Sequence, residues 1–140
     1  MRWLLVMVLA LSGLGLGCGP RDRGMNLKDA VRAYNQHLRW NRFEAASSFV
    51  EISKRAEWLA TRTAGSAGLH FTDIQVVRLQ KPDAEEKSVE VLVALSWYRM
   101  PQTTVQRAVY AQVWQELEGR WRLTEEREVE NAQAPPPQWP

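Results

Sequence analysis

Cysteine and histidine are scarce in this chain, and their scarcity excludes several kinds of site. The single cysteine, Cys18, leaves no partner for an intramolecular disulfide and no CxxC motif for redox chemistry or zinc. Only two histidines, His37 and His70, are present, whereas a zinc site needs three or four ligands. His70 with Asp73 supplies one histidine and one carboxylate. We therefore expect no metal and no metal cofactor.

Charge of one sign is not in excess, and phosphate-binding motifs are missing. The sequence has 18 basic and 16 acidic side chains, and nucleic-acid binding relies on a surplus of lysine and arginine. It also lacks a glycine-rich loop of Walker or Rossmann spacing and a GxSxG nucleophile elbow. We expect no nucleic-acid partner, no nucleotide cofactor and no catalytic residue set of these types.

Long hydrophobic runs are also missing. The longest apolar segment, from Trp3 to Leu16, has about fourteen residues, against roughly twenty for a membrane-spanning helix. Met1 and Arg2 give it a basic start, and small residues end it at Gly17. This order is typical of a secretory signal. We expect residues 1–17 to be a signal peptide.

The end of this segment, "LGLGC" at residues 14–18, resembles the lipobox of bacterial lipoproteins, with Gly15 where leucine is usual. In that family the cysteine becomes the new N-terminus and carries acyl chains such as palmitate. The resemblance implies a lipid on Cys18. Because Gly19 is not aspartate, it also implies an outer-membrane location facing the periplasm. In the alternative reading, Cys18 is a small apolar residue near a signal that is cut elsewhere.

The remainder, about 120 residues, suffices for one domain with a modest core. Residues 18–25 combine the cysteine with glycine, proline and charge, and we interpret them as a lipidated tether. Residues 26–130 form the predicted domain. Residues 131–140 are rich in proline and predict a disordered or polyproline tail, with recognition through Trp139 as the alternative.

The hydrophobic period changes near Gly68. Before it, apolar residues recur at helical spacing, which predicts a helix after the cap Asn26, a short one from 43 to 50 and a third from 52 to 60. After it, β-branched and alternating residues predict strands near 71–80, 88–98, 103–117 and 120–129, with a tight turn at Gly119. The predicted class is α+β, with N-terminal helices packed on a curved antiparallel sheet of about four strands.

This order, in which "AYNQHLRWNRFEAASSFV" precedes strands ending in "VWQELEGRWRL", resembles small NTF2-like and cystatin-like domains over residues 26–129. The resemblance implies a pocket between sheet and helices in some relatives, and an isomerase or dehydratase activity in others. Ketosteroid-isomerase-like sites use a carboxylate base with tyrosine and acid donors. The corresponding residues here would be Asp73, Tyr98 and Tyr110.

Alternation along the strands predicts apolar groups on both faces of the sheet. Trp97 shares the valine face of its strand and is expected in the core, whereas residues 124–130, "TEEREVE", are expected to be a solvated strand end. The second face can line a ligand pocket, meet another protein or be covered by helices and long side chains. The residues assigned to this ligand or partner face are Leu92, Tyr98, Tyr110 and Trp114.

Together these features favour a non-enzymatic, lipid-anchored periplasmic domain that binds or scaffolds a cell-envelope protein through its sheet. The alternative hypothesis is a pocket protein that holds a small apolar ligand, or an isomerase- or dehydratase-like enzyme of the NTF2-like type.

Overall fold

The computed structural model describes residues 24–80 and 82–129. The predicted signal peptide, Cys18, most of the tether and the proline-rich tail lie outside these residues. Along the described chain the elements are α1 (Leu27–Arg39), α2 (Phe43–Ser47), a 3-10 turn (Ile52–Lys54), α3 (Arg55–Ala64), β1 (Leu69–Arg78), β2 (Ser88–Arg99), β3 (Gln102–Leu117) and β4 (Arg120–Glu128). None of the helices within these two ranges has the length and hydrophobicity to span a membrane.

Helix α1 begins at the predicted cap. The Asn26 side chain accepts a hydrogen bond from the Asp29 backbone N–H at 2.9 Å, and the Asp29 carboxylate complements the helix N-terminus. One face of the helix is buried along its whole length, as the 3.6-residue period requires. Its buried residues are Leu27, Ala30, Val31, Tyr34, Asn35 and Leu38.

The third predicted helix is divided in two. Residues Ile52–Lys54 form a 3-10 turn, and α3 then continues to Ala64, beyond the expected end at residue 60. No residue of α3 is fully buried, but Trp58 and Leu59 pack against the core. Helix α3 therefore leaves space between itself and the sheet.

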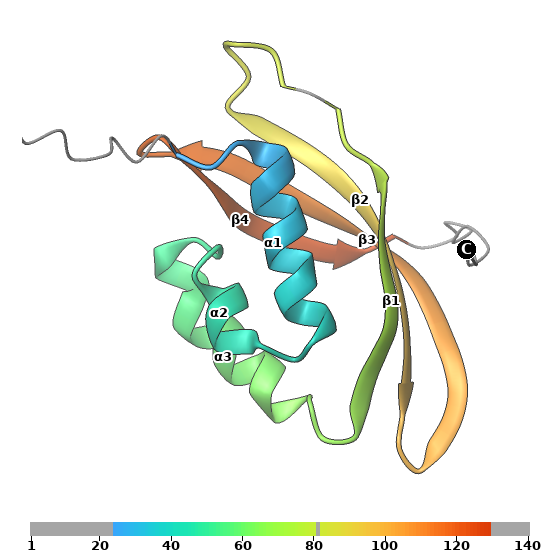
Figure 1. Ribbon diagram of the computed structural model, residues 1–140. Coiled ribbons are helices and arrows are strands. Elements are labelled where there is room, and N and C mark those ends of the chain that lie inside the picture. The colour runs from blue at the N-terminus through green and yellow to red at the C-terminus, as the bar shows by residue number, and fades with distance from the viewer. Residues whose placement is uncertain (1–23, 81, 130–140) are drawn as a thin grey trace, which may run out of the picture.

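The sheet is an antiparallel meander in the order β1-β2-β3-β4, and the helices lie over one of its faces (Figure 1). The sheet curves around them. At the β3-β4 turn, Glu118 and Gly119 both have positive φ, 51° and 73°, as a tight hairpin turn requires. The predicted α+β class, with N-terminal helices on four antiparallel strands, is confirmed.

The helix-covered face, called the inner face below, carries the core. Residues paired directly across antiparallel strands share a face, so Val93 lies with Tyr110, and Val89 with Trp114. Trp114 is completely buried and meets the Tyr34 ring edge-on at 5.7 Å between centroids. Trp114 is the largest of the fully buried side chains in the described residues.

The outer face is covered by its own long side chains. Arg127 of β4 donates to Glu90 of β2 at 2.9 Å, so this ion pair crosses the intervening strand β3. Arg78 approaches the other Glu90 oxygen at 3.6 Å. The small residue Ala111, which pairs with both Leu92 and Arg127, is fully buried. The second apolar face of the sheet was predicted to line a pocket, to meet another protein or to be covered by helices and long side chains. Around Ala111 it is covered by long side chains.

Candidate functional site

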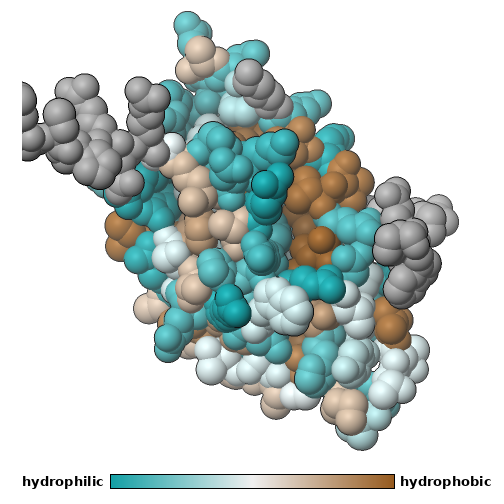
Figure 2. All heavy atoms as spheres, in the orientation of Figure 1, coloured by the Kyte–Doolittle hydropathy of each residue, from teal (hydrophilic) through white to brown (hydrophobic). Residues whose placement is uncertain are grey.

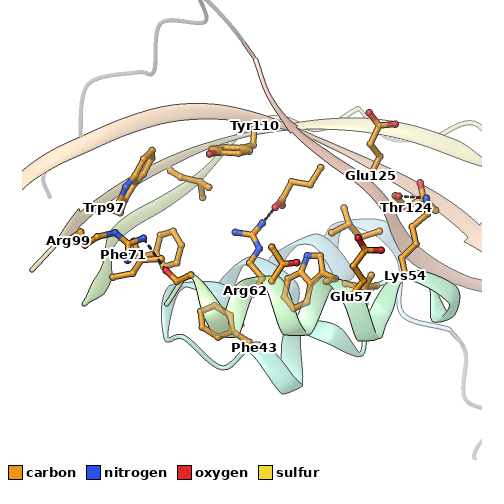
Figure 3. A pocket seen from close by; sticks show the side chains of 18 residues that line it. Phe43, Lys54, Glu57, Arg62, Phe71, Trp97, Arg99, Tyr110, Thr124 and Glu125 are labelled. Carbon is orange, nitrogen blue, oxygen red and sulfur yellow. Dashed lines mark hydrogen bonds and ion pairs between the residues drawn. The ribbon is translucent and has the colours of Figure 1, made fainter. Parts of the chain in front are cut away.

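A cavity of about 700 Å³ lies between the inner face of the sheet and helices α2 and α3 (Figure 3). Every strand and both helices contribute to its walls. One end is apolar and aromatic, and the other, near the start of α3, is charged. The apolar lining consists of Phe43, Val50, Trp58, Leu69, Phe71, Leu95, Trp97, Tyr110 and Leu123.

Arg62 of α3 lies in the middle of this cavity (Figure 3). Its guanidinium forms an ion pair with Glu126 of β4 and lies over the Trp58 ring, 5.4 Å from its centroid. A guanidinium has five N–H donors, so the contact with Glu126 leaves others for a ligand. The Trp58 ring and Glu126 together fix the orientation of this cation.

Glu126 is held from three directions. Besides Arg62, its Oε2 accepts from the Tyr34 hydroxyl at 3.2 Å and from the Gln112 amide at 2.9 Å. Its side chain is only 6% exposed, and a buried carboxylate is stable only with such partners. Burial raises the pKa of Tyr34 well above its usual range, although the Arg62 charge opposes the shift. Tyr34 therefore stays a neutral donor.

The hydrogen-bond network continues into the core behind Glu126. Gln112 exchanges two amide hydrogen bonds with Asn35, at 2.9 and 3.2 Å, and accepts from the Trp114 indole at 3.4 Å. Asn35 also donates to the Val31 carbonyl at 2.9 Å. The Gln112, Asn35 and Trp114 side chains thus all have hydrogen-bond partners, and the network ties β3 and β4 to α1 and supports Glu126 from the core side.

Cations at the two ends of the cavity bond to backbone carbonyls. At the charged end, Lys54 donates to the Thr124 carbonyl at 2.7 Å. At the aromatic end, Arg99 donates to the carbonyls of Ala67 and Gly65 at 2.6 and 3.0 Å. These contacts tie β2 and β4 to the two ends of α3 and so define the width of the opening.

The four residues expected to form one ligand or partner face do not lie on the same face. Tyr110 lines the cavity and Trp114 is in the core, both on the inner face, while Leu92 and Tyr98 are half-buried on the outer face. The expectation of a single shared face is thus wrong, because the register pairs Tyr110 and Trp114 with valines of β2. Trp97, expected on the valine face, does lie there and lines the cavity.

The three residues of the suggested isomerase-like set are also separated. Asp73 accepts from Arg39 of α1 at 3.2 Å, and the Tyr98 ring stacks on His70 at 5.0 Å. Only Tyr110 faces the cavity, where burial, reinforced by the nearby Glu128 charge, raises the pKa of its hydroxyl. The geometry does not assemble a base and its donors from these residues.

Neither histidine belongs to a metal-binding group. His37 is half-buried beside Phe49, with ring centroids 6.2 Å apart, and its buried Nδ1 has no hydrogen-bond partner. In residues 24–80 and 82–129, no three histidine, cysteine, aspartate or glutamate side chains gather closely enough to hold a metal ion.

Arg62 and Glu126, the polar centre of the cavity, were not among the site residues predicted from the sequence. The prediction that residues 124–130 form a solvated strand end is wrong for Glu126. An irregularity in the β3-β4 register falls between Val113 and Trp114, so that both Leu123 and Glu126 face inward. The alternation rule fails across such a bulge. One sequence feature does point to this site: polar residues Gln112 and Glu126 occur on neighbouring predicted strands. When such residues are buried, each requires a hydrogen-bond partner, and here they pair with each other.

A further groove, of about 590 Å³, runs between α1 and β1. Figure 2 shows hydrophobic side chains gathered beside α1 on the side of β1, with hydrophilic ones around them. The floor of the groove consists of Ile74, Val76 and Leu79, and α1 lines it with Lys28, Arg32, Asn35, Gln36 and Arg39.

No protein-family model matches the chain, and no curated protein matches it. Among solved structures it is similar to a SEC-C motif containing protein from Rhodopseudomonas palustris, at 13% identity and a TM-score of 0.62, over 75% of this chain and 80% of that one. It is also similar to the intermembrane space region of the chloroplast protein ARC6, at 12% identity and a TM-score of 0.50, over 73% and 92%.

A further similarity is to an NTF-2 like protein of unknown function from Shewanella oneidensis, at 13% identity and a TM-score of 0.45, over 72% of this chain and 93% of that one. At such identities, the two likenesses with the higher TM-scores show a common fold and carry no activity with them.

Proposed function

We propose that this chain is a non-enzymatic binding domain whose helix-sheet cavity holds a small molecule with an apolar, partly aromatic body and one anionic or hydrogen-bond-accepting group. The supporting observation is the cavity of about 700 Å³ with aromatic walls and Arg62 at its centre. Ligand pockets have this size, and they combine an apolar lining with a few well-placed polar groups. The aromatic end has this character, whereas Lys54, Glu57 and Glu125 make the other end charged. The apolar end would take the body of the ligand, and Arg62 its polar group.

The state of Glu126 favours binding over catalysis. A general base must be able to take a proton from the substrate, but the Glu126 oxygens already accept from Arg62, Tyr34 and Gln112. Three donors stabilise the charged carboxylate and occupy three of its four lone-pair sites, including both of those on Oε2. Its role is therefore to orient Arg62, and we infer no reaction at this site.

The hypothesis of a scaffold that binds a protein through its sheet has less support. It was based on a continuous apolar face, but the strand register places Tyr110 and Trp114 on the inner face of the sheet and Leu92 and Tyr98 on the outer face. On the outer side, the Glu90-Arg127 ion pair covers the middle of the sheet. The cavity therefore offers the better-defined binding site.

Binding can be tested with the fluorescent probe 1-anilinonaphthalene-8-sulfonate, which combines an aromatic body with an anionic group. We expect saturable fluorescence enhancement, and an affinity about tenfold lower in the Trp97→Ala variant, because an aromatic contact of about 1.4 kcal/mol is lost. Tyr98→Ala is the matched control, since Tyr98 is the next residue of β2 and points to the other face. Equal losses in both variants would contradict binding in the cavity.

We also propose that the domain is anchored by lipid on Cys18 at the periplasmic face of the outer membrane. The support is the lipobox-like segment at residues 14–18 and the short tether after it. Two acyl chains already give stable anchoring. The intact mass of membrane-extracted protein is expected to begin at Cys18 and to include acyl chains, and the Cys18→Ser variant is expected to lack them. An unacylated mass that starts elsewhere would refute the anchor.

A further inference from the structure

The groove between α1 and β1 is separate from the helix-sheet cavity and shares no lining residue with it. Strand β1 is an edge of the sheet, because the strand order is β1-β2-β3-β4. Among the described residues, only β2 pairs with it. An exposed edge strand that carries apolar side chains is a surface on which another chain docks. The groove of about 590 Å³ therefore lies beside an edge that the described part of the fold leaves open.

The floor of the groove is apolar and partly exposed. Ile74 and Val76 pair with inner-face residues of β2, so they lie on the side of the sheet that the helices cover. Val76 nevertheless remains 45% exposed. The adjacent Val77 is 47% exposed but does not line the groove. Apolar surface that the fold leaves open in this way is typical of an interaction site.

The wall that α1 contributes to the groove is positively charged. Lys28 and Arg32 are exposed, and neither forms an ion pair with any described residue. Arg39, further along the same wall, is neutralised by Asp73 at 3.2 Å. No carboxylate of the described chain lines the groove. Like charges four residues apart on a helix repel each other, so this wall is complementary to a negatively charged partner.

The wall and the floor of the groove repeat at a similar spacing. Helix α1 and strand β1 lie side by side and run in opposite directions (Figure 1). Lys28 and Arg32 are about 6 Å apart along the helix axis, at 1.5 Å per residue. Ile74 and Val76 are about 6.6 Å apart along the strand. Alternate residues of any extended chain have this spacing, so the groove matches a peptide that lies along β1.

We propose that this groove binds an extended, acidic segment of another protein. Alternate residues of the segment point into the groove, because successive side chains of an extended chain leave it on opposite sides. There its carboxylates contact Lys28 and Arg32, and its apolar side chains cover Ile74 and Val76. Since this groove and the helix-sheet cavity share no residue, the segment and a small ligand can be bound together.

A second copy of the chain fits the groove less well. Two β1 strands paired about a two-fold axis would form one continuous sheet with both helix layers on the same side. The basic walls of both α1 helices would then meet at the junction, and like charges disfavour such an interface. Register irregularities between Phe71 and Asp73 and between Val76 and Arg78 also interrupt β1. They hinder the long pairing that joins two sheets, whereas a short segment needs only the stretch between them.

The test uses the full chain in a neutral detergent and isothermal titration calorimetry with a synthetic peptide of the repeat Glu-Ser-Val-Ser. We expect saturable binding. A peptide with glutamine in place of glutamate should bind at least tenfold more weakly, because it lacks the negative charge. The repeat Glu-Val-Ser-Ser has the same composition but places glutamate and valine on opposite sides of an extended chain. It should bind at least fivefold more weakly, and equal binding of all three peptides would overturn the proposal.

Two pairs of variants locate the binding site. Val76→Asp places a carboxylate in the groove and should weaken binding at least tenfold. Val77→Asp is the matched control, since Val77 is about equally exposed and lies outside the groove, and it should weaken binding less than threefold. Arg32→Gln should weaken binding about threefold, the scale of an exposed charge pair. Arg107→Gln, on the outer face, should leave binding unchanged. Thermal unfolding of each variant, measured in parallel, separates lost binding from lost folding.

Other occupants of the groove would give different results. A dimer of the protein alone that Val76→Asp dissociates and Val77→Asp does not would identify a second copy as the occupant. Binding to phosphatidylglycerol vesicles with the same difference between these variants, without peptide binding, would identify a lipid surface. Either result would overturn the acidic segment. Equal weakening within each pair of variants would mean general charge attraction and would overturn the site.

Discussion

Replacing Glu126 by leucine is expected to lower the free energy of unfolding by about 3 kcal/mol, at the lower end of the range for breaking a buried ion pair. The change leaves Arg62 without its counter-charge and removes the acceptor of the Tyr34 and Gln112 donors. Because the Arg62 side chain is 27% exposed, water compensates part of the loss. Urea denaturation monitored by tryptophan fluorescence gives the value.

Two further variants separate charge from hydrogen bonding at this position. Glu126→Gln keeps an acceptor for Tyr34 and is expected to cost less than Glu126→Leu. In the double variant Arg62→Met and Glu126→Leu, the uncompensated cation is gone, so part of the stability should return. A loss below about 1 kcal/mol in Glu126→Leu would mean that the pair behaves like an exposed salt bridge, and that the network does not position Arg62.

The fold class follows from patterns that a single chain displays. Asn26 with Asp29 marks the start of α1, and the change of period near Gly68 separates helices from strands. Gly119 marks the last turn, where positive φ is needed. These signals are local, and local signals suffice for the order of elements. The third helix was less well predicted, since the division at Arg55 into a 3-10 turn and α3 leaves the apolar spacing almost unchanged.

Which residues share a face depends on register, which alternation within one strand does not specify. The turn between β2 and β3 does carry this information. Its two residues, Met100 and Pro101, pair Arg99 with Gln102, so odd-numbered residues of β2 face even-numbered residues of β3. The irregularity near Trp97 and Arg99 leaves this parity unchanged. Had a two-residue turn at Met100 and Pro101 been predicted from the sequence, the resulting register would have placed Tyr110 and Trp114 on the same face as the valines of β2.

The polar centre of the cavity was harder to predict. The bulge opposite Val113 and Trp114 brings Glu126 to the inner face, and no glycine or proline marks it in the sequence. Arg62 lies on α3, a helix whose residues are all at least partly exposed and whose apolar face is therefore weak. Sites assembled from a bulge and a loosely packed helix depend on long-range pairing rather than on spacing along the chain.

Trp114→Ala is expected to cost about 3 to 5 kcal/mol of unfolding free energy, the range for a fully buried large aromatic. Trp114 has no exposed surface, packs against Tyr34 and donates to Gln112, so truncation leaves a cavity and an unsatisfied acceptor. Trp40→Ala is the matched control, because Trp40 is 60% exposed at the end of α1. We expect a cost of at most about 1 kcal/mol there.

This comparison also tests the register from which the cavity is built. If Trp114 lay on an exposed partner-binding face, its truncation would cost no more than that of Trp40 and would affect only a binding partner. Equal costs would mean that β3 is shifted by one residue, which would move every side chain of the strand to the opposite face. Tyr110 would then leave the cavity, and the proposed ligand site would lose one of its aromatic walls. A large cost for Trp114 alone supports the register and the position of Tyr110 beside Arg62.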